Sequence, residues 1–226
     1  MYAAGHSFFT YMSDNADSLS SCCRLRNEIQ DNGFSYTLGA GGVSTGSKSV
    51  LTVNLNRCIQ YAVRNGRPYT EFLEDVVDRM HKFQLAYNEN LKHLQSKGML
   101  PLFDAGYITM GRQYLTIGVN GLVEAAEFLG IPINDNDEYA AFVQEVLGLI
   151  EQYNKQYRTA DVLFNCEMIP AENVGVKHAK WDREDGYIVP RDCYNSYFYA
   201  VEDPSLNVLD KFRLHGRRYV EHLTGG

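Results

Sequence analysis

The sequence lacks any apolar run approaching the roughly 20 residues that a membrane-spanning helix needs. It also lacks an excess of basic residues, since 21 lysines and arginines stand against 28 aspartates and glutamates, for a formal net charge of -7. Such a chain does not bind nucleic acid through a general basic field, although a single nucleotide remains allowed as substrate. The first residues contain neither a basic nor an apolar stretch, so the sequence predicts a cytoplasmic protein that binds neither membrane nor nucleic acid.

Cysteine and histidine motifs for metal or redox chemistry are missing as well. The five cysteines show no C-x-x-C spacing and the six histidines no H-x-x-x-H spacing, so we expect no metal site. No Ser-His-Asp arrangement is recognisable. The chain does contain an adjacent pair, Cys22 and Cys23, in a polar stretch beside Arg24. Positive charge stabilises a thiolate, so this pair is a better candidate for reactivity than Cys58, although two small buried hydrophobic side chains are the simpler interpretation.

Strand-like and helix-like segments alternate along the chain, which is typical of an α/β fold. Strands are predicted at 7–12, 50–55, 114–119 and 162–166, and helices at 56–64, 69–97, 122–129, 137–157, 170–180 and 204–215. We expect Asn56 to cap the first helix, 13–33 to form a polar loop and 181–186 to form a turn. Because no internal repeat or interdomain linker is present, residues 1–226 are predicted to form one unit.

A glycine-rich segment at 39–46 is a further candidate for chemistry. Gly41 and Gly46 have the G-x-x-x-x-G spacing of a phosphate-binding loop, but the lysine that should follow directly is displaced to Lys48. The segment also leads into a predicted strand and not into a helix. We therefore interpret it as a turn whose glycines allow close approach of a backbone or a ligand.

Two predicted helices begin directly after predicted strands, at Asn120-Gly121 and at Pro170-Ala171. A helix N-terminus carries free N–H groups and a partial positive charge, so we expect both turns to point such groups outward, where they would suit phosphates. Every α/β protein has such helix ends, and the feature by itself identifies no function.

Four segments, taken together and in this order, resemble the anaerobic, class III ribonucleoside-triphosphate reductases. They are Ser20-Ser21-Cys22-Cys23-Arg24-Leu25-Arg26-Asn27, the run from Phe34 to Ser47, the run from Tyr114 to Leu122, and Pro170-Ala171-Glu172-Asn173. The resemblance spans Phe8 to Gly226. It implies a portion of the ten-stranded α/β barrel of glycyl-radical enzymes, with a finger loop that carries the radical cysteine. Because the family places arginine directly after that cysteine, the resemblance assigns this role to Cys23.

The resemblance also implies a reaction and a set of residue roles. A thiyl radical at Cys23 would abstract the 3′ hydrogen of the ribose, the 2′ hydroxyl would leave as water, and the hydrogen would later be returned. Cys22, Arg24 and Ser47 would support catalysis, and Ser47 stands where family members that use formate carry an asparagine. Substrate binding would fall to Gly41, Gly42, Asn120, Gly121, Pro170, Ala171 and Glu172.

Members of this family contain more than this chain does. The resemblance implies that the chain is one segment of the catalytic barrel, binds no cofactor itself and is inactive alone, whereas a regulatory region, the first barrel half and a glycyl-radical region with zinc lie elsewhere. The full system would be a homodimer that binds ribonucleoside triphosphates and needs a radical-SAM activating protein with an iron–sulfur cluster and S-adenosylmethionine. A non-catalytic nucleotide-binding or structural remnant, or a glycyl-radical enzyme of the formate-lyase type, are the alternatives; the intact motifs favour the reductase.

Overall fold

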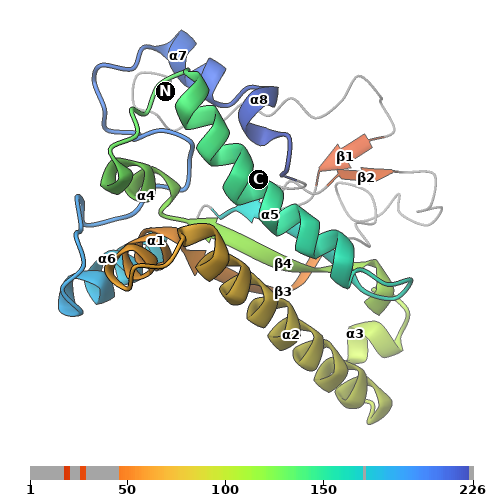
Figure 1. Cartoon of the computed structure of the whole chain (residues 1–226). Coiled ribbons are helices and arrows are strands. Elements are labelled where there is room, and N and C mark those ends of the chain that lie inside the picture. Colours follow the sequence, from red (N-terminus) through yellow and green to blue (C-terminus); the bar gives the residue numbers. More distant parts are fainter. Residues whose placement is uncertain (1–17, 21–25, 29–45, 170–171, 224–226) are drawn as a thin grey trace.

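The computed structural model of the chain describes residues 18–20, 26–28, 46–169 and 172–223 (Figure 1). Two short strands, β1 (Ser18–Ser20) and β2 (Arg26–Glu28), pair in antiparallel fashion. The prediction of a polar loop over 13–33 is therefore wrong for these two segments, because their backbones hydrogen-bond to each other as strands. The predicted strand at 7–12 lies outside the described residues, and so do Cys22, Cys23, Arg24, Gly41, Gly42, Pro170 and Ala171.

The main sheet has three parallel strands in the order β3-β4-β5. They are β3 (Gly46–Asn54), β4 (Gln113–Asn120) and β5 (Leu163–Met168), so all three strands predicted in this part of the chain are present. β3 begins at Gly46 instead of residue 50, which places Ser47 and Lys48 on a strand. Parallel neighbours need long crossover connections, and helices supply them here.

The helices follow the strands in sequence order. Between β3 and β4 lie α1 (Leu55–Arg64), α2 (Tyr69–Ser96), α3 (Pro101–Asp104) and the short 3-10 helix η3 (Met110–Arg112). Between β4 and β5 lie α4 (Leu122–Leu129) and α5 (Asp137–Tyr157), and after β5 come α6 (Glu172–Glu184), α7 (Val208–Leu214) and α8 (Arg217–Val220). The mixed α/β class predicted from the sequence is thus confirmed. Among the described residues, none of these helices has the length and apolar character that crossing a bilayer requires.

Two helix boundaries differ from the prediction. α6 continues to Glu184, through the turn predicted at 181–186, because Asp182 in that stretch is fully buried and anchored by hydrogen bonds. α7 begins only at Val208, because Asn207 caps it: the Asn207 side chain accepts a hydrogen bond from the backbone N–H of Asp210 at 3.0 Å.

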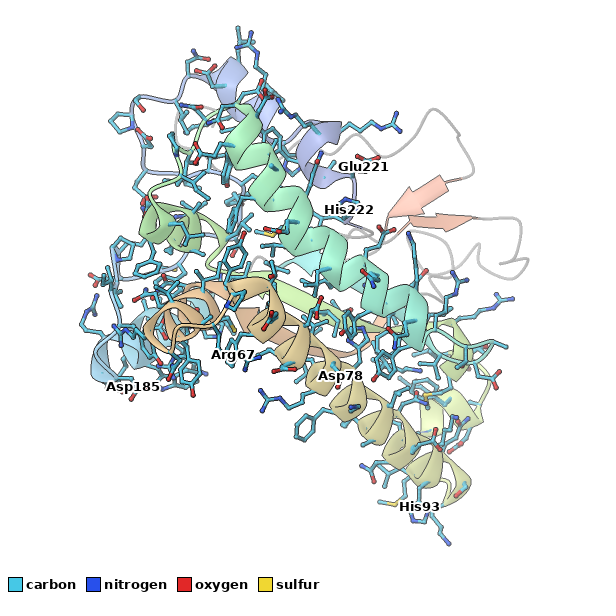
Figure 2. The ribbon with its side chains drawn as sticks, viewed as in Figure 1. Arg67, Asp78, His93, Asp185, Glu221 and His222 are labelled. Atoms are coloured by element: carbon cyan, nitrogen blue, oxygen red, sulfur yellow. The ribbon has the colours of Figure 1, made fainter. Side chains whose placement is uncertain are left out.

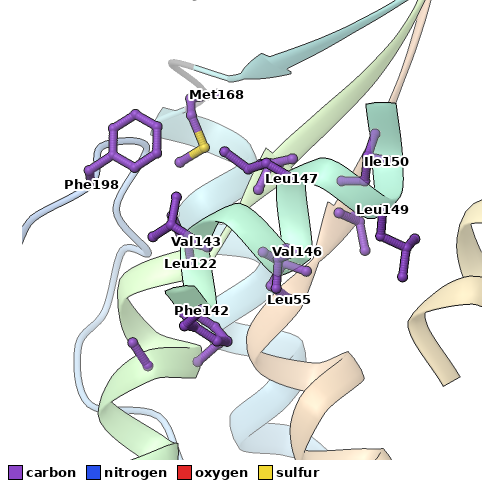
Figure 3. Close-up of a cluster of buried hydrophobic side chains, with 14 of the residues drawn as sticks. Leu55, Leu122, Phe142, Val143, Val146, Leu147, Leu149, Ile150, Met168 and Phe198 are labelled. Carbon is purple, nitrogen blue, oxygen red and sulfur yellow. The ribbon is translucent and has the colours of Figure 1, made fainter. Parts of the chain in front are cut away.

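The hydrophobic core lies between one face of the sheet and the helices α1, α2, α4 and α5, of which α2 and α5 lie side by side across the sheet in Figure 1. Alternate strand residues face it, among them Ile117 and Val119 of β4 and Cys166 of β5. Figure 3 shows the contribution of α5, whose buried side chains recur at helical spacing: Phe142, Val143, Val146, Leu147 and Ile150. The opposite sheet face, which carries Thr116 and Asn165, adds no described residue to this core.

Candidate functional site

The carboxyl ends of the three parallel strands lie at one edge of the sheet, where α1, α4 and α6 gather (Figure 1). Asn54 ends β3 and Asn120 ends β4, and the strand register places the two directly opposite each other. α4 begins just after β4, and α6 begins at Glu172 after β5, so the starts of both helices lie at this edge, whereas Pro170 and Ala171 lie outside the described residues. In open α/β sheets, ligands bind at this edge.

Asp182, on α6, is the centre of a hydrogen-bond network at this edge. Its fully buried carboxylate accepts hydrogen bonds from Asn54 Nδ2 at 2.9 and 3.0 Å, from the Tyr194 hydroxyl at 2.7 Å and from Arg57 Nε at 2.6 Å. Asn56 Nδ2 donates to the Tyr194 hydroxyl at 2.7 Å and, at 3.3 Å, to the same carboxylate. One side chain therefore ties α6 to the end of β3, to α1 and to the segment that follows α6.

Asn54 also starts α1, because its Oδ1 accepts a hydrogen bond from the backbone N–H of Arg57 at 3.1 Å. The prediction that Asn56 caps this helix is wrong. Asn56 is fully buried within the first turn, and its amide donates to Tyr194 and to the Ile188 carbonyl instead. A single asparagine thus ends a strand, begins a helix and holds the carboxylate of α6.

The charges in this network are paired. Arg57 also contacts Asp185, near the end of α6 (Figure 2), at 2.6 Å. Burial acts to lower the pKa of Arg57, but hydrogen bonds to the two aspartates outweigh it and the pKa is raised. Burial and the hydrogen bond to Asp182 raise the pKa of Tyr194, so its hydroxyl keeps the proton that it donates. Within the described part of the chain, no group of three or more His, Cys, Asp or Glu side chains could hold a metal ion.

His178, one turn before Asp182 on α6, binds Asn120. The Nδ2 of Asn120 donates to the carbonyls of Tyr194 at 3.4 Å and Asn195 at 3.2 Å, so its Oδ1 faces Nδ1 of His178, 2.9 Å away. Because a carbonyl oxygen only accepts, Nδ1 carries the ring proton. Burial lowers the pKa of His178 in spite of the opposing attraction of Asp182, and the ring is therefore neutral at neutral pH.

The start of α4 is covered by the segment 194–196. Gly121 is buried, and its N–H donates to the Asn195 carbonyl at 3.4 Å; its φ of 78° favours glycine. Asn195 is held in turn by Glu124, which accepts from its backbone N–H at 3.0 Å and its side chain at 3.1 Å. The expectation that Gly121 points a free N–H outward is therefore wrong. The assignment of Asn120 and Gly121 as substrate-binding residues stays a prediction.

Ser47 lies away from this edge, near the amino end of β3. Its Oγ is 2.7 Å from Oγ1 of Thr116 on β4, and Thr116 donates to Oδ1 of Asn165 on β5, also at 2.7 Å. These three side chains form a polar row across the sheet, on the face opposite the core. The structure thus separates Ser47 from Asn120 and Gly121 at the carboxyl edge of the sheet, and the role of Ser47 in catalysis stays a prediction.

Sequence reasoning missed Asp182, His178 and Asn165. No local pattern marks Asp182, since it lies in a polar stretch that reads as a turn. A signal did exist for Asn165: in Leu163–Met168, apolar side chains at 164, 166 and 168 alternate with Asn165 and Glu167. This period of two is typical of a strand with one polar face.

Comparison with known proteins shows what this chain resembles as a whole. The family described as anaerobic ribonucleoside-triphosphate reductase matches residues 2–226. The comparison with curated proteins found no match.

Several solved structures are similar to the chain. The anaerobic ribonucleotide reductase from Thermotoga maritima with dATP bound in the specificity site is 30% identical, with a TM-score of 0.71; the match covers 80% of this chain and 32% of that one. The same enzyme with glycerol in the active site is 28% identical, with a TM-score of 0.75 and coverage of 85% and 33%. Another anaerobic ribonucleotide reductase is 29% identical, with a TM-score of 0.72 and coverage of 81% and 30%. The chain therefore spans about a third of the length of the solved structures it matches.

Proposed function

The chain belongs to the family of anaerobic ribonucleoside-triphosphate reductases, and we propose that it is one segment of the catalytic barrel that reduces a ribonucleoside triphosphate to its 2′-deoxy product. The observation that carries the proposal is the agreement between the family match over residues 2–226 and the structural match to a third of a solved reductase. A sheet with helices packed on one face and polar side chains on the other supports its place in the wall of a ten-stranded barrel.

Cys23, outside the described residues, is the proposed radical residue. It lies in the connection between β1 and β2, the proposed finger loop, with Cys22 and Arg24 beside it as supporting residues. Its thiyl radical would remove the 3′ hydrogen of the ribose, the 2′ hydroxyl would leave as water, and the hydrogen would return. The protein must hold the sulfur against one C–H bond and exclude water while it does so.

The substrate phosphates are proposed to lie at the start of α6. α6 begins at Glu172, after β5, and a helix N-terminus attracts anions; Pro170, Ala171 and Glu172 are the residues proposed to bind the phosphates. Asn120 and Gly121 are proposed to shape the same edge through His178 and the segment 194–196. Gly41 and Gly42 would allow close approach of the nucleotide. One of the solved relatives is a complex with dATP and CTP, which supports a nucleotide as the ligand class.

The proposed activity needs parts beyond this chain, since it spans about a third of the solved reductases. We propose that a second barrel segment and a glycyl-radical segment with a zinc site complete the enzyme as a homodimer in the cytoplasm. A radical-SAM activating protein, with its iron–sulfur cluster and S-adenosylmethionine, would supply the radical. The chain alone should reduce nothing.

Complementation tests this proposal. The chain is combined anaerobically with the complementing reductase segments, activating protein, S-adenosylmethionine and a reductant, and the deoxynucleotide product is quantified. Cys23→Ser should abolish turnover but leave nucleotide binding intact, because the stronger O–H bond does not support reversible hydrogen transfer. Cys22→Ser is the matched control and should be milder. Turnover that survives Cys23→Ser would place the radical elsewhere, whereas a complex that assembles and binds nucleotide but never reduces it would favour a non-catalytic module.

A further inference from the structure

The sheet face opposite the core carries two buried polar side chains that the proposed reaction leaves without a role. Asn165 and Glu167 on β5 are 0% and 2% exposed, and because they are two positions apart on a strand they share one face. The hydrogen bond from Thr116 to Asn165 shows which face it is. Burying an amide or a carboxylate costs free energy unless the group is hydrogen-bonded, so the hydrogen-bond partners of Asn165 determine what its burial costs.

Thr116 and Ser47 hold the amide of Asn165 in place. The hydroxyl of Thr116 donates its one proton to Asn165 Oδ1, and Ser47, whose hydroxyl also bonds to the Ser49 carbonyl at 3.0 Å, lies 2.7 Å from Thr116 Oγ1. The Nδ2 of Asn165 is buried and has no hydrogen-bond partner among the described residues. If the amide group were rotated by 180°, Nδ2 would face Thr116, and Oδ1 would then be buried without a hydrogen-bond donor. The Nδ2 of Asn165 can therefore donate a hydrogen bond to an acceptor that the described residues do not supply.

Glu167 places an acceptor beside this donor. A carboxylate has about four lone-pair sites, so it can accept further hydrogen bonds in addition to any that it already makes. The register partner of Glu167 is Gly118, and the Ile169 side chain lies over that glycine: a Cβ there would be 2.4 Å from Ile169 Cγ1. The face thus presents an amide and a carboxylate next to an apolar side chain, a combination that suits a sugar.

We propose that Asn165 and Glu167 bind the 2′ and 3′ hydroxyls of the substrate ribose, an inference that rests on the proposed function. A cis-diol offers oxygens that accept from an amide N–H and protons that a carboxylate accepts. The two side chains are roughly 7 Å apart along the strand, close enough to serve neighbouring hydroxyls. Glu167 lies five positions before Glu172, where α6 begins, so the triphosphate of a nucleotide bound here can extend toward that helix N-terminus.

The 2′ hydroxyl makes this inference testable, because the deoxy product lacks it. The experiment uses the assembled enzyme before activation, so that binding is measured without turnover, and protection of Cys23 from alkylation reports occupation of the substrate site. A ribonucleoside triphosphate and its 2′-deoxy analogue are titrated separately. Asn165→Ala and Glu167→Gln should each reduce the ribo-to-deoxy affinity ratio about tenfold, which corresponds to about 1.4 kcal/mol, by weakening the ribonucleotide.

Asn88→Ala is the matched control. Asn88 on α2 is also fully buried and also has an unpaired amide atom, its Oδ1, but it belongs to a helix and not to this sheet face, so the ratio should stay at the wild-type value. If Asn165→Ala does not assemble, Asn165→Asp removes the donor at constant size and should give the same tenfold loss. The inference would be overturned if the wild-type ribo-to-deoxy affinity ratio were near one, or if this ratio were unchanged in both the Asn165 and Glu167 variants. Either result would leave the reductase proposal standing. A wild-type assembly that binds no ribonucleotide would overturn both.

Discussion

Asn54 and Asp182 lie 128 positions apart in the chain, yet the side-chain nitrogen of Asn54 donates hydrogen bonds to both carboxylate oxygens of Asp182, at 2.9 and 3.0 Å. This contact joins the end of β3 to α6. Since Asp182 also accepts from Tyr194 and Arg57, one buried carboxylate fixes the elements that surround the proposed phosphate site.

Replacement of this carboxylate should weaken the fold. In Asp182→Asn an amide nitrogen would replace one carboxylate oxygen, so it would face the donor of either Arg57 or Tyr194, and the buried negative charge that pairs with Arg57 would be lost. We expect the free energy of unfolding to fall by about 2–4 kcal/mol, measured by urea denaturation followed by circular dichroism.

Asp185→Asn is the control for that experiment, because Asp185 pairs with the same arginine but its side chain is 57% exposed. Exposed ion pairs contribute about 0–1 kcal/mol, so the change should stay below about 1 kcal/mol. Equal effects of the two substitutions would contradict the central role assigned to the buried carboxylate.

The middle of β4 should not tolerate a side chain at Gly118. A Cβ there would be 2.4 Å from Ile169 Cγ1 and 2.7 Å from Thr52 Oγ1, so Gly118→Ala should cost about 1–3 kcal/mol in the free energy of unfolding. For Gly148→Ala, on α5, the nearest atoms would be those of the His222 ring at 3.4 to 3.7 Å, so the change should be neutral or stabilising by up to about 1 kcal/mol, since alanine is the better helix former. Thermal denaturation of both variants gives the comparison, and a Gly118 variant as stable as the wild type would refute the close packing.

Stability should fall in mild acid. Burial lowers the pKa of both His81 and His178 from the usual 6.5. The unfolded chain then takes up protons near pH 6.5 while the folded chain does not, so the unfolding free energy is full above that pH and is lost as the pH falls toward the lower folded values. Urea denaturation from about pH 7.5 to about pH 5 measures this slope. His178→Gln should flatten it and the exposed His93→Gln should not; an unaltered slope in the His178 variant would count against the buried neutral ring.

The cysteines should differ in their rates of alkylation. Burial raises the pKa of Cys58 to about 12 and also raises that of the fully buried Cys166, so both should react slowly. Cys193 is exposed and should be labelled readily. We expect Cys23 to react first, because the neighbouring Arg24 favours its thiolate. Peptide mapping after limiting alkylation gives the order, and a Cys58 labelled as fast as Cys193 would contradict the raised pKa of the Cys58 thiol.

The sequence by itself determined the features that local patterns encode. Strand and helix periodicities correctly placed β4, β5, α2 and α5, because the spacing of apolar side chains within one element already shows which of its faces will be buried. The four motifs, read in order, pointed to the reductase family that the match over residues 2–226 confirms. The alternation of apolar and polar residues in β5 also indicates a polar sheet face that includes Asn165, although this residue was not singled out from the sequence.

Only the tertiary structure decided which polar residues meet. From the sequence, Asp182 is predicted to lie in a turn, but it lies on α6, where Asn54 donates to its carboxylate. Asn54 is 128 positions away, so no local pattern could show this contact. Asn56 reads as a helix cap and Asn54 as the end of a strand, yet Asn54 caps α1, and the amide of Asn56 donates to Tyr194 instead. The N–H groups at the start of α4 were expected to be free, but the N–H of Gly121 donates to the Asn195 carbonyl. Each outcome depends on the free energy of burying and hydrogen-bonding groups that are distant in sequence, and that energy exists only once the helices have packed against the sheet.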